Sequence, residues 1–210
     1  MQHLFFGGIH PQYNKEMSTV ITTLHAIQPK QVVIPLQQHI GVPCTPLVNV
    51  GDRVLRYQKI GDGEGLCVPV HASVSGTVVA IEPRPHVSGR QILSIVIDND
   101  FQDESISCSA ISTPLEQLDQ DEVLHAIREA GIVGMGGAAF PGNVKALSAM
   151  GNVDTLIANA CECEPYITAD DSLLRTEPEH VLQGMQILHH VLHPQRTVLA
   201  VEDNKAEAIE

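Results

Sequence analysis

The chain has 210 residues, of which 43% are hydrophobic and 3% aromatic, and its formal net charge at pH 7 is −13. This length allows one large domain or two small ones, and no run of about 18 apolar residues that could cross a bilayer is present. The charge is uneven, because residues 1–100 hold seven basic and seven acidic side chains while residues 101–210 hold five and 18. An acidic half excludes a nucleic-acid-binding surface, which needs clustered Lys and Arg. The start, MQHLFFGGIH, lacks the features of a signal peptide, so we expect a cytoplasmic protein.

Residues 1–104 are expected to form a β-rich module. Short apolar or alternating runs are separated by Gly, Pro, Asn and Asp, a pattern typical of strands joined by turns. Two segments, Val50–Val54 and Ser75–Val78, resemble the two halves of a lipoyl/biotinyl-type hammerhead, or barrel-sandwich, fold. A carrier domain would present a lysine in the hairpin between the halves, but Gly61–Gly65 contains none, so a covalent swinging arm is not expected. The expected strands are Val32–Pro35, Pro46–Val50, Lys59–Ile60, Thr77–Ile81 and Ile92–Ile97.

A polar, irregular segment, Phe101–Pro114, is expected as a linker, and after it the hydrophobic period changes from 2 to 3.6. Strands separated by helices indicate a parallel sheet. We therefore expect an α+β and α/β protein whose second domain, residues 115–210, is Rossmann-like and truncated at its C-terminus. The expected elements are helices at Leu118–Ala130, at Glu177–His193 and from Lys205 onward, and strands at Val153–Ala158 and Thr197–Val201.

The most glycine-dense stretch is GIVGMGGAAFPGNVK. Gly134, Gly136 and Gly137 remove side chains where a backbone approaches a flat or anionic group, and we expect Gly134 or Gly137 at positive φ. Pro141 suits the start of a helix whose first amides, with Lys145 one turn in, form a candidate phosphate cradle. The loop departs from the dinucleotide fingerprint, which needs a preceding strand, and from a Walker A loop, which needs another lysine. A tight interhelical turn packed with small residues remains the alternative.

Polar residues follow both predicted strands of the second domain. Asn159, Glu162 and Glu164 follow the first strand, and Asp203 and Asn204 follow the second. Ligands of open α/β sheets bind outside the carboxyl ends of the strands. We therefore expect these residues and the glycine loop to line one site.

The cysteines and histidines predict no metal site. Five scattered cysteines without a CxxC motif indicate reduced thiols. Cys161 and Cys163 are too few ligands by themselves. Asp170 and Asp171 are expected on a solvated acidic face. The histidines without ligand spacing are His10, His39, His71 and His86.

The order of these motifs resembles a known family. GxGGxxFPxxxK, followed by a strand and NAxExEP, resembles the flavin-binding, NADH-oxidising subunit of respiratory complex I. The full sequences of these segments are more similar to the C subunit of the Rnf-type electron-transport complex; they read GGAAFPGNVK, ECEPYITADD and VEDNKAEAI. The N-terminal GGIHPQYNK and VPVHASVSGTVVAIEPRP fit that same Rnf protein, so the resemblance covers nearly the whole chain.

This resemblance implies FMN and NADH as cofactors, with hydride transfer between C4 of the nicotinamide and N5 of the flavin. The cofactors carry that step, and no catalytic acid or base is expected from the protein. The family pattern has an acidic residue at Cys161 and an arginine at Met135, so this chain offers fewer polar contacts there. The implied contacts are Gly134, Gly136 and Gly137 against the flavin, Lys145 at its phosphate, Asn159 and Glu162 at the ribityl hydroxyls or ring edge, Asp203 and Asn204 at the far side, Phe140 stacked on the nicotinamide nucleotide, and Glu164 beside the nicotinamide.

The resemblance also implies a subunit of a membrane-bound, ion-translocating complex. Electrons would pass from FMN to [4Fe–4S] clusters outside this chain, and indirectly to a ferredoxin or quinone pathway. The chain would bind other subunits on the cytoplasmic face of the inner membrane without a span of its own. Two alternatives remain, a related cobalamin reductase of bacterial microcompartments and a protein like the non-catalytic scaffold subunit of the sodium-pumping NADH:quinone reductase.

Overall fold

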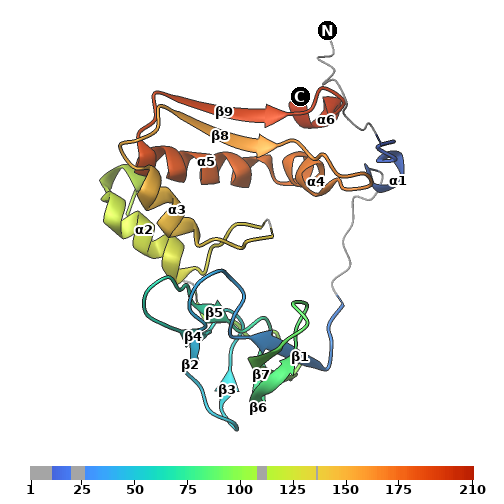
Figure 1. The fold of residues 1–210 in the computed structure, drawn as a ribbon, viewed down its shortest axis with the longest axis vertical. Helices are drawn as coiled ribbons and strands as arrows, with labels where there is room; N and C mark the ends of the chain where they lie inside the picture. Colours follow the sequence, from blue (N-terminus) through green and yellow to red (C-terminus); the bar gives the residue numbers. More distant parts are fainter. Residues whose placement is uncertain (1–10, 20–26, 108–112, 136) are drawn as a thin grey trace. The chain divides into compact units, whose positions relative to one another are not determined.

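A computed structural model describes residues 11–19, 27–107, 113–135 and 137–210 (Figure 1). The chain divides into two compact units. The barrel unit comprises residues 27–152 and 190–192, and the α/β unit comprises residues 153–189 and 193–210 together with the described N-terminal residues 11–19. Within the described part of the chain, no helix is long and apolar enough to cross a membrane.

The barrel unit contains two antiparallel sheets. Their strand orders are β1-β7-β6-β3 and β2-β4-β5. Buried apolar side chains from both sheets, among them Ile34, Ile60, Val70 and Ile97, form one cluster, so the core lies between the sheets. The strands are β1 (Gln31–Pro35), β2 (Thr45–Pro46), β3 (Arg53–Val54), β4 (Lys59–Asp62), β5 (Val70–His71), β6 (Gly76–Pro85) and β7 (Gln91–Asn99).

The two hammerhead-like segments pair with each other, as their resemblance predicts. Arg53 lies opposite Thr77, and Val54 lies opposite Gly76, in the antiparallel β3–β6 pair. A Cβ at Gly76 would lie 1.9 Å from the carbonyl oxygen of Asp98, so only glycine allows β6 to approach β7 this closely.

Short helices complete the barrel unit. They are the 3-10 helix η1 (Leu115–Gln117), α2 (Gln120–Glu129) and α3 (Gly142–Ala149). Asp119 and Glu122 form a capping box at the start of α2, which explains why the helix begins there. At its other end, Arg128 donates to the Asp62 carboxylate at 2.7 Å, and this ion pair attaches α2 to the hairpin after β4.

The α/β unit is built around a parallel pair of strands, β8 (Thr155–Ala160) and β9 (Arg196–Val201). Two helices, α4 (Ala169–Thr176) and α5 (Pro178–Leu192), connect them in sequence. His193, in the left-handed conformation, ends α5 before Pro194. The remaining helices of this unit are α1 (Glu16–Thr19) and α6 (Ala206–Ile209).

Some expected boundaries differ from the structure. The expected linker Phe101–Pro114 is not free of structure, because Ser105 forms a bridge with Arg56 of the barrel unit. Residues 108–112 of that segment lie outside the described residues. The sequence did not predict α4, nor the two-residue strands β3 and β5.

Candidate functional site

The glycine loop is a narrow backbone hairpin in the barrel unit. Val133 bridges Pro141, and the amide of Gly134 donates to the carbonyl of Phe140 at 2.8 Å. The amide of Gly134 is therefore already paired and is not a free donor for a ligand. Gly136 lies outside the described residues.

The left-handed residues of this loop are not the ones expected. Neither Gly134 nor Gly137 has positive φ, so that prediction is wrong. Among the described residues of the loop, the left-handed ones are Gly131 (φ 69°) and Ala139 (φ 43°). At Gly131 an added Cβ would lie 2.7 Å from the carbonyl oxygen of Pro69, so this glycine is required by packing as well as by backbone conformation. At Gly137 an added Cβ would meet nothing within 4 Å, which leaves this position open to a ligand.

The helix after the loop has no side-chain cap, although the amide of its first residue, Gly142, donates to the carbonyl of Ile132 at 2.8 Å. Pro141 is the N-cap residue of α3, and no side chain caps this helix. Lys145 is exposed one turn into α3, and the side-chain oxygen of Asn143 is buried without a hydrogen-bond partner. Uncapped first-turn amides and a nearby ammonium group are the donors that a phosphate prefers. The later first-turn amides and Lys145 are therefore the candidate anion donors of this part of the chain.

The tip of the glycine loop faces a cavity of about 390 Å³ within the barrel unit. Ligand pockets usually have volumes of about 300–1,000 Å³. Phe140, next to the tip, is 37% exposed, so its ring is available for stacking. The cavity is lined by Gln37, Gln38, His39, Ile40, His86, Val87, Ser88, Arg90, Ile92, Gly137, Ala138 and Ala139.

The carboxyl ends of β8 and β9 lie together at one edge of the α/β unit. Ala160 at the end of β8 is paired with Val201 at the end of β9. The polar residues that follow both strands are therefore neighbours, as the sequence predicts. The exposed residues at this edge are Asn159, Glu164, Asp203 and Asn204.

Glu162 is placed differently from these exposed residues. It is only 4% exposed, and its carboxylate accepts from the backbone amides of Asp170 at 2.7 Å and Asp171 at 3.4 Å. Lys205 Nζ lies 3.6 Å from the same carboxylate. Glu162 thus holds the start of α4 and the segment after β9, and its oxygens are engaged within the protein.

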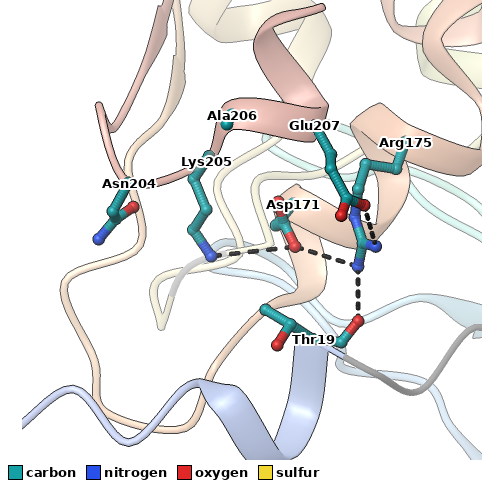
Figure 2. A pocket seen from close by; sticks show the side chains of 7 residues that line it. All are labelled: Thr19, Asp171, Arg175, Asn204, Lys205, Ala206 and Glu207. Atoms are coloured by element: carbon teal, nitrogen blue, oxygen red, sulfur yellow. Dashed lines mark hydrogen bonds and ion pairs between the residues drawn. The ribbon is translucent and has the colours of Figure 1, made fainter.

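Asp171 is buried, which corrects the expectation of a solvated acidic face. It is 5% exposed, and its carboxylate lies 3.1 Å from Arg175 and 4.0 Å from Lys205. Figure 2 shows these side chains converging from α4 and from the segment after β9, with Arg175 also contacting Glu207 and the carbonyl of Thr19. They line a polar cavity of about 300 Å³ that Asn204 and Ala206 also border.

Sequence reasoning missed Lys15. Its Nζ donates to the backbone carbonyl of Glu162 and lies 3.6 Å from a Glu202 carboxylate oxygen. The amide of Tyr166 also donates to the carbonyl of Tyr13 at 2.9 Å. Lys15 is the last residue of the GGIHPQYNK motif, so the motif itself was the available signal.

Two buried polar atoms at the strand ends make ion pairs but no hydrogen bond, namely Lys205 Nζ and Glu202 Oε2. Buried polar groups are almost always hydrogen-bonded in folded proteins. Nearby, burial and then the charges of Glu162 and Glu164 raise the pKa of the Asp170 carboxyl. The buried charges at this edge are therefore balanced by ion pairs rather than by hydrogen bonds.

The predicted site residues fall into the two units. Gly134, Gly137, Phe140 and Lys145 belong to the barrel unit. The structure brings the other predicted residues together at one edge of the α/β unit. These are Asn159, Glu162, Glu164, Asp203 and Asn204.

Comparison with known proteins identifies the family. Residues 3–102 match the family described as the RnfC barrel sandwich hybrid domain, and residues 127–210 match the Nuo51 FMN-binding domain. Over 208 residues the chain is 43% identical to the C subunit of the Na⁺-translocating ferredoxin:NAD⁺ oxidoreductase complex of Acetobacterium woodii. The chain belongs to the RnfC family. The barrel-sandwich fold and the likeness to the complex I flavin subunit are thereby confirmed.

Other members of the RnfC family are equally similar. The C subunits of the ion-translocating oxidoreductase complexes of Serratia proteamaculans and Vibrio cholerae are each 44% identical to the chain. Each of the three alignments covers 98% of this chain. The chain spans 47% of the Acetobacterium relative, 29% of the Serratia relative and 27% of the Vibrio relative.

Proposed function

We propose that this chain provides the FMN and NADH sites of an NADH-linked electron-transfer subunit. The observation that carries the proposal is the parallel β8–β9 pair, whose adjoining carboxyl ends present polar residues within the segment that matches an FMN-binding domain. FMN, when bound, accepts a hydride from the nicotinamide and passes electrons on. The protein's own residues bind and orient the two cofactors.

The glycine loop and α3 would hold the phosphate end of FMN. Gly134, Gly136 and Gly137 carry no side chain that could obstruct a ligand, and the open space at Gly137 supports this role. Lys145 would donate to the phosphate alongside the uncapped amides of α3. Phe140 would stack on the nicotinamide nucleotide, because its ring is partly exposed next to the loop tip.

The edge of the α/β unit would hold the ribityl chain and the nicotinamide. Asn159 and Glu164 are exposed there and would contact the ligands directly, with Asp203 and Asn204 at the far side. Glu162 would contribute mainly by holding Lys205 and the start of α4, because its carboxylate is engaged within the protein.

The fold supports a finer assignment. The β8-α4-α5-β9 segment is a parallel strand–helix–strand unit, and we assign it to the Rossmann-like domain that the sequence predicts over residues 115–210, of which residues 115–152 belong to the compact barrel unit. The barrel-sandwich module, predicted over residues 1–104, would act as a docking surface for other subunits, since its Gly61–Gly65 hairpin has no lysine; the described residues 11–19 of that range belong to the α/β unit.

The names of the relatives support a place in a larger complex. The Acetobacterium relative is a subunit of a Na⁺-translocating ferredoxin:NAD⁺ oxidoreductase. By analogy, this chain would lie on the cytoplasmic face of the membrane, bound to other subunits, and pass electrons from FMN to [4Fe–4S] clusters outside it. A ferredoxin or quinone pathway would be reached indirectly.

Rapid mixing of NADH with the FMN-loaded full-length protein, without oxygen, tests this proposal. We expect loss of the oxidised flavin absorbance, and we expect Phe140→Ala to raise the NADH concentration needed for half-maximal rate while leaving flavin content unchanged. Cys163→Ser is a control, since Cys163 is exposed one residue before Glu164 and has no assigned role. A full-length protein that binds FMN but is not reduced by NADH would contradict the proposal and favour a scaffold.

A further inference from the structure

Three buried side chains of metal-ligand type meet in the barrel unit, and none of them is assigned to a cofactor. They are His39, Cys44 and Cys67, which are 6%, 4% and 3% exposed. One ligand atom from each lies within 4.8 Å of the other two. Cys44 lies immediately before β2 and Cys67 lies in the segment before β5, so the chain folds back to bring the thiols together.

The His39 ring is already oriented for metal binding. Its Nδ1 lies 3.0 Å from the carbonyl oxygen of Ile40, and a carbonyl can only accept, so Nδ1 carries the proton. Nε2 then carries no proton and has a free lone pair. It accepts a hydrogen bond from the amide of Val68 at 3.3 Å. Metal-binding histidines almost always donate their other N–H to a carbonyl or carboxylate in this way.

The separations suit a tetrahedral ion. Zn–S bonds of about 2.3 Å place two thiolates about 3.8 Å apart in a tetrahedron, and the two sulfurs lie 3.5 Å apart here. The carbonyl oxygen of Val68 lies 3.2 Å from Cys44 Sγ and 3.7 Å from Cys67 Sγ, close enough to approach the fourth position. The two sulfurs therefore need little movement to bind one ion.

We propose that His39, Cys44 and Cys67 form a structural Zn²⁺ site in the barrel unit. Two thiolates and an imidazole are ligands that Zn²⁺ prefers, and the carbonyl oxygen of Val68 would fill the fourth position that a structural site needs. Binding would release the two thiol protons and replace the Val68 N–H···Nε2 hydrogen bond with a metal bond.

The ion would fasten two segments that otherwise meet through a few hydrogen bonds. The amide of Val42 donates to the carbonyl of Leu66 at 2.9 Å, between the segments that carry Cys44 and Cys67. His39 also lines the cavity at the tip of the glycine loop. Zinc would thus stiffen one wall of that cavity without taking part in electron transfer.

The test uses the 210-residue chain purified under reducing conditions without a chelator. We expect about one zinc per chain by elemental analysis, and on replacement with Co²⁺ the visible bands of a tetrahedral ion with two thiolates. Cys44→Ser and Cys67→Ser should each weaken Zn²⁺ affinity at least about 100-fold, and His39→Gln at least about 10-fold. The matched control is the double variant Cys161→Ser, Cys163→Ser, which should bind zinc like the unmodified chain.

The Co²⁺ spectrum of the unmodified chain decides the matter even if a cysteine variant fails to fold. Absence of zinc and of that spectrum would overturn the proposal. Zinc binding that is lost in the Cys161→Ser, Cys163→Ser control would also overturn it, because the ion would then lie elsewhere. A Cys44–Cys67 disulfide found by mass spectrometry in protein isolated under reducing conditions would replace the zinc site with a covalent link.

Discussion

Lys205 Nζ lies 3.6 Å from the carboxylate of Glu162, and this contact joins the segments that follow β9 and β8. Both side chains are at least 95% buried, and Asp171 lies 4.0 Å from the same ammonium group. The carboxyl ends of the two strands are therefore held together by buried charge, beneath the exposed residues assigned to the cofactors.

Replacing Lys205 should destabilise the α/β unit strongly. Lys205→Met leaves Glu162 and Asp171 buried with one cation fewer, and removing one partner of a buried ion pair costs about 3–5 kcal/mol. Urea denaturation followed by circular dichroism measures the change. Lys145→Met is the control, since Lys145 is exposed and its loss should change the free energy of unfolding by less than about 0.5 kcal/mol. Equal stability of the two variants would show that Lys205 is not a structural cation.

Substitutions at the base and at the tip of the glycine loop should have different effects on stability and on FMN binding. Gly131→Ala should lower the free energy of unfolding by more than about 1 kcal/mol, because the position has φ 69° and a Cβ would lie 2.7 Å from the Pro69 carbonyl oxygen. Gly137→Val should leave stability nearly unchanged but weaken FMN binding. Thermal unfolding and flavin titration of both variants check this pair, and normal FMN binding by Gly137→Val would show that the loop is only a turn.

Asp62 should make the barrel unit sensitive to acid. Burial alone would raise the pKa of its carboxyl, but hydrogen bonds from Arg128, from the Gly63 amide and from Lys59 outweigh burial and lower the pKa from 3.8 to about 2. A depressed carboxyl pKa contributes stability above pH 3.8 that is lost as the pH falls toward 2.

Asp62→Asn should therefore cost about 1 kcal/mol at pH 7 and remove part of the decline in stability between pH 4 and pH 2. Urea denaturation at several pH values measures both effects. Glu64→Gln in the same hairpin is the control, since Glu64 is exposed and makes no ion pair among the described residues. Parallel pH profiles for the unmodified chain and Asp62→Asn would contradict this account.

Asp170 and Asp171 should behave in opposite ways. Burial and then the Glu162 and Glu164 charges raise the pKa of Asp170, so its ionisation opposes folding as the pH rises past 3.8. Asp170→Asn should therefore stabilise the chain at pH 7, with the gain fading in acid. Asp171→Asn should destabilise it, because Arg175 and Lys205 lose a buried partner. Thermal unfolding at pH 7 and pH 3.5 compares them, and equal shifts in the same direction would count against this reading.

Hydrophobic periodicity, together with the Gly, Pro, Asn and Asp residues between apolar runs, predicted the longer elements of the fold. The runs at Thr77–Ile81 and Ile92–Ile97 lie within β6 and β7, and the apolar stripe after Glu177 is α5. The strands β3 and β5 have only two residues each, too few for any period. The helix α4 was missed because its acidic start was interpreted as a solvated surface.

Only part of the candidate site could likewise be predicted from the sequence. The exposed residues at the strand ends were predictable, because parallel strands bring their carboxyl ends together. The burial of Asp171 was not, because Lys205, one of its partners, follows a different strand. The meeting of Cys44 with Cys67 likewise depends on how the chain folds back, which their spacing does not reveal.

The most direct test of the central claim is an FMN titration of the full-length protein, in which the quenching of flavin fluorescence measures binding. We expect the unmodified protein to bind FMN at one site. Lys145→Met should weaken binding about 10- to 100-fold, as expected for loss of a charge-assisted hydrogen bond. Asn159→Ala should also weaken binding, and it should lower the free energy of unfolding by only about 1 kcal/mol, because Asn159 Oδ1 accepts from the amide of Cys161. An unmodified protein that binds no FMN, or one whose affinity is unchanged by both substitutions, would contradict the claim that these residues form a flavin site.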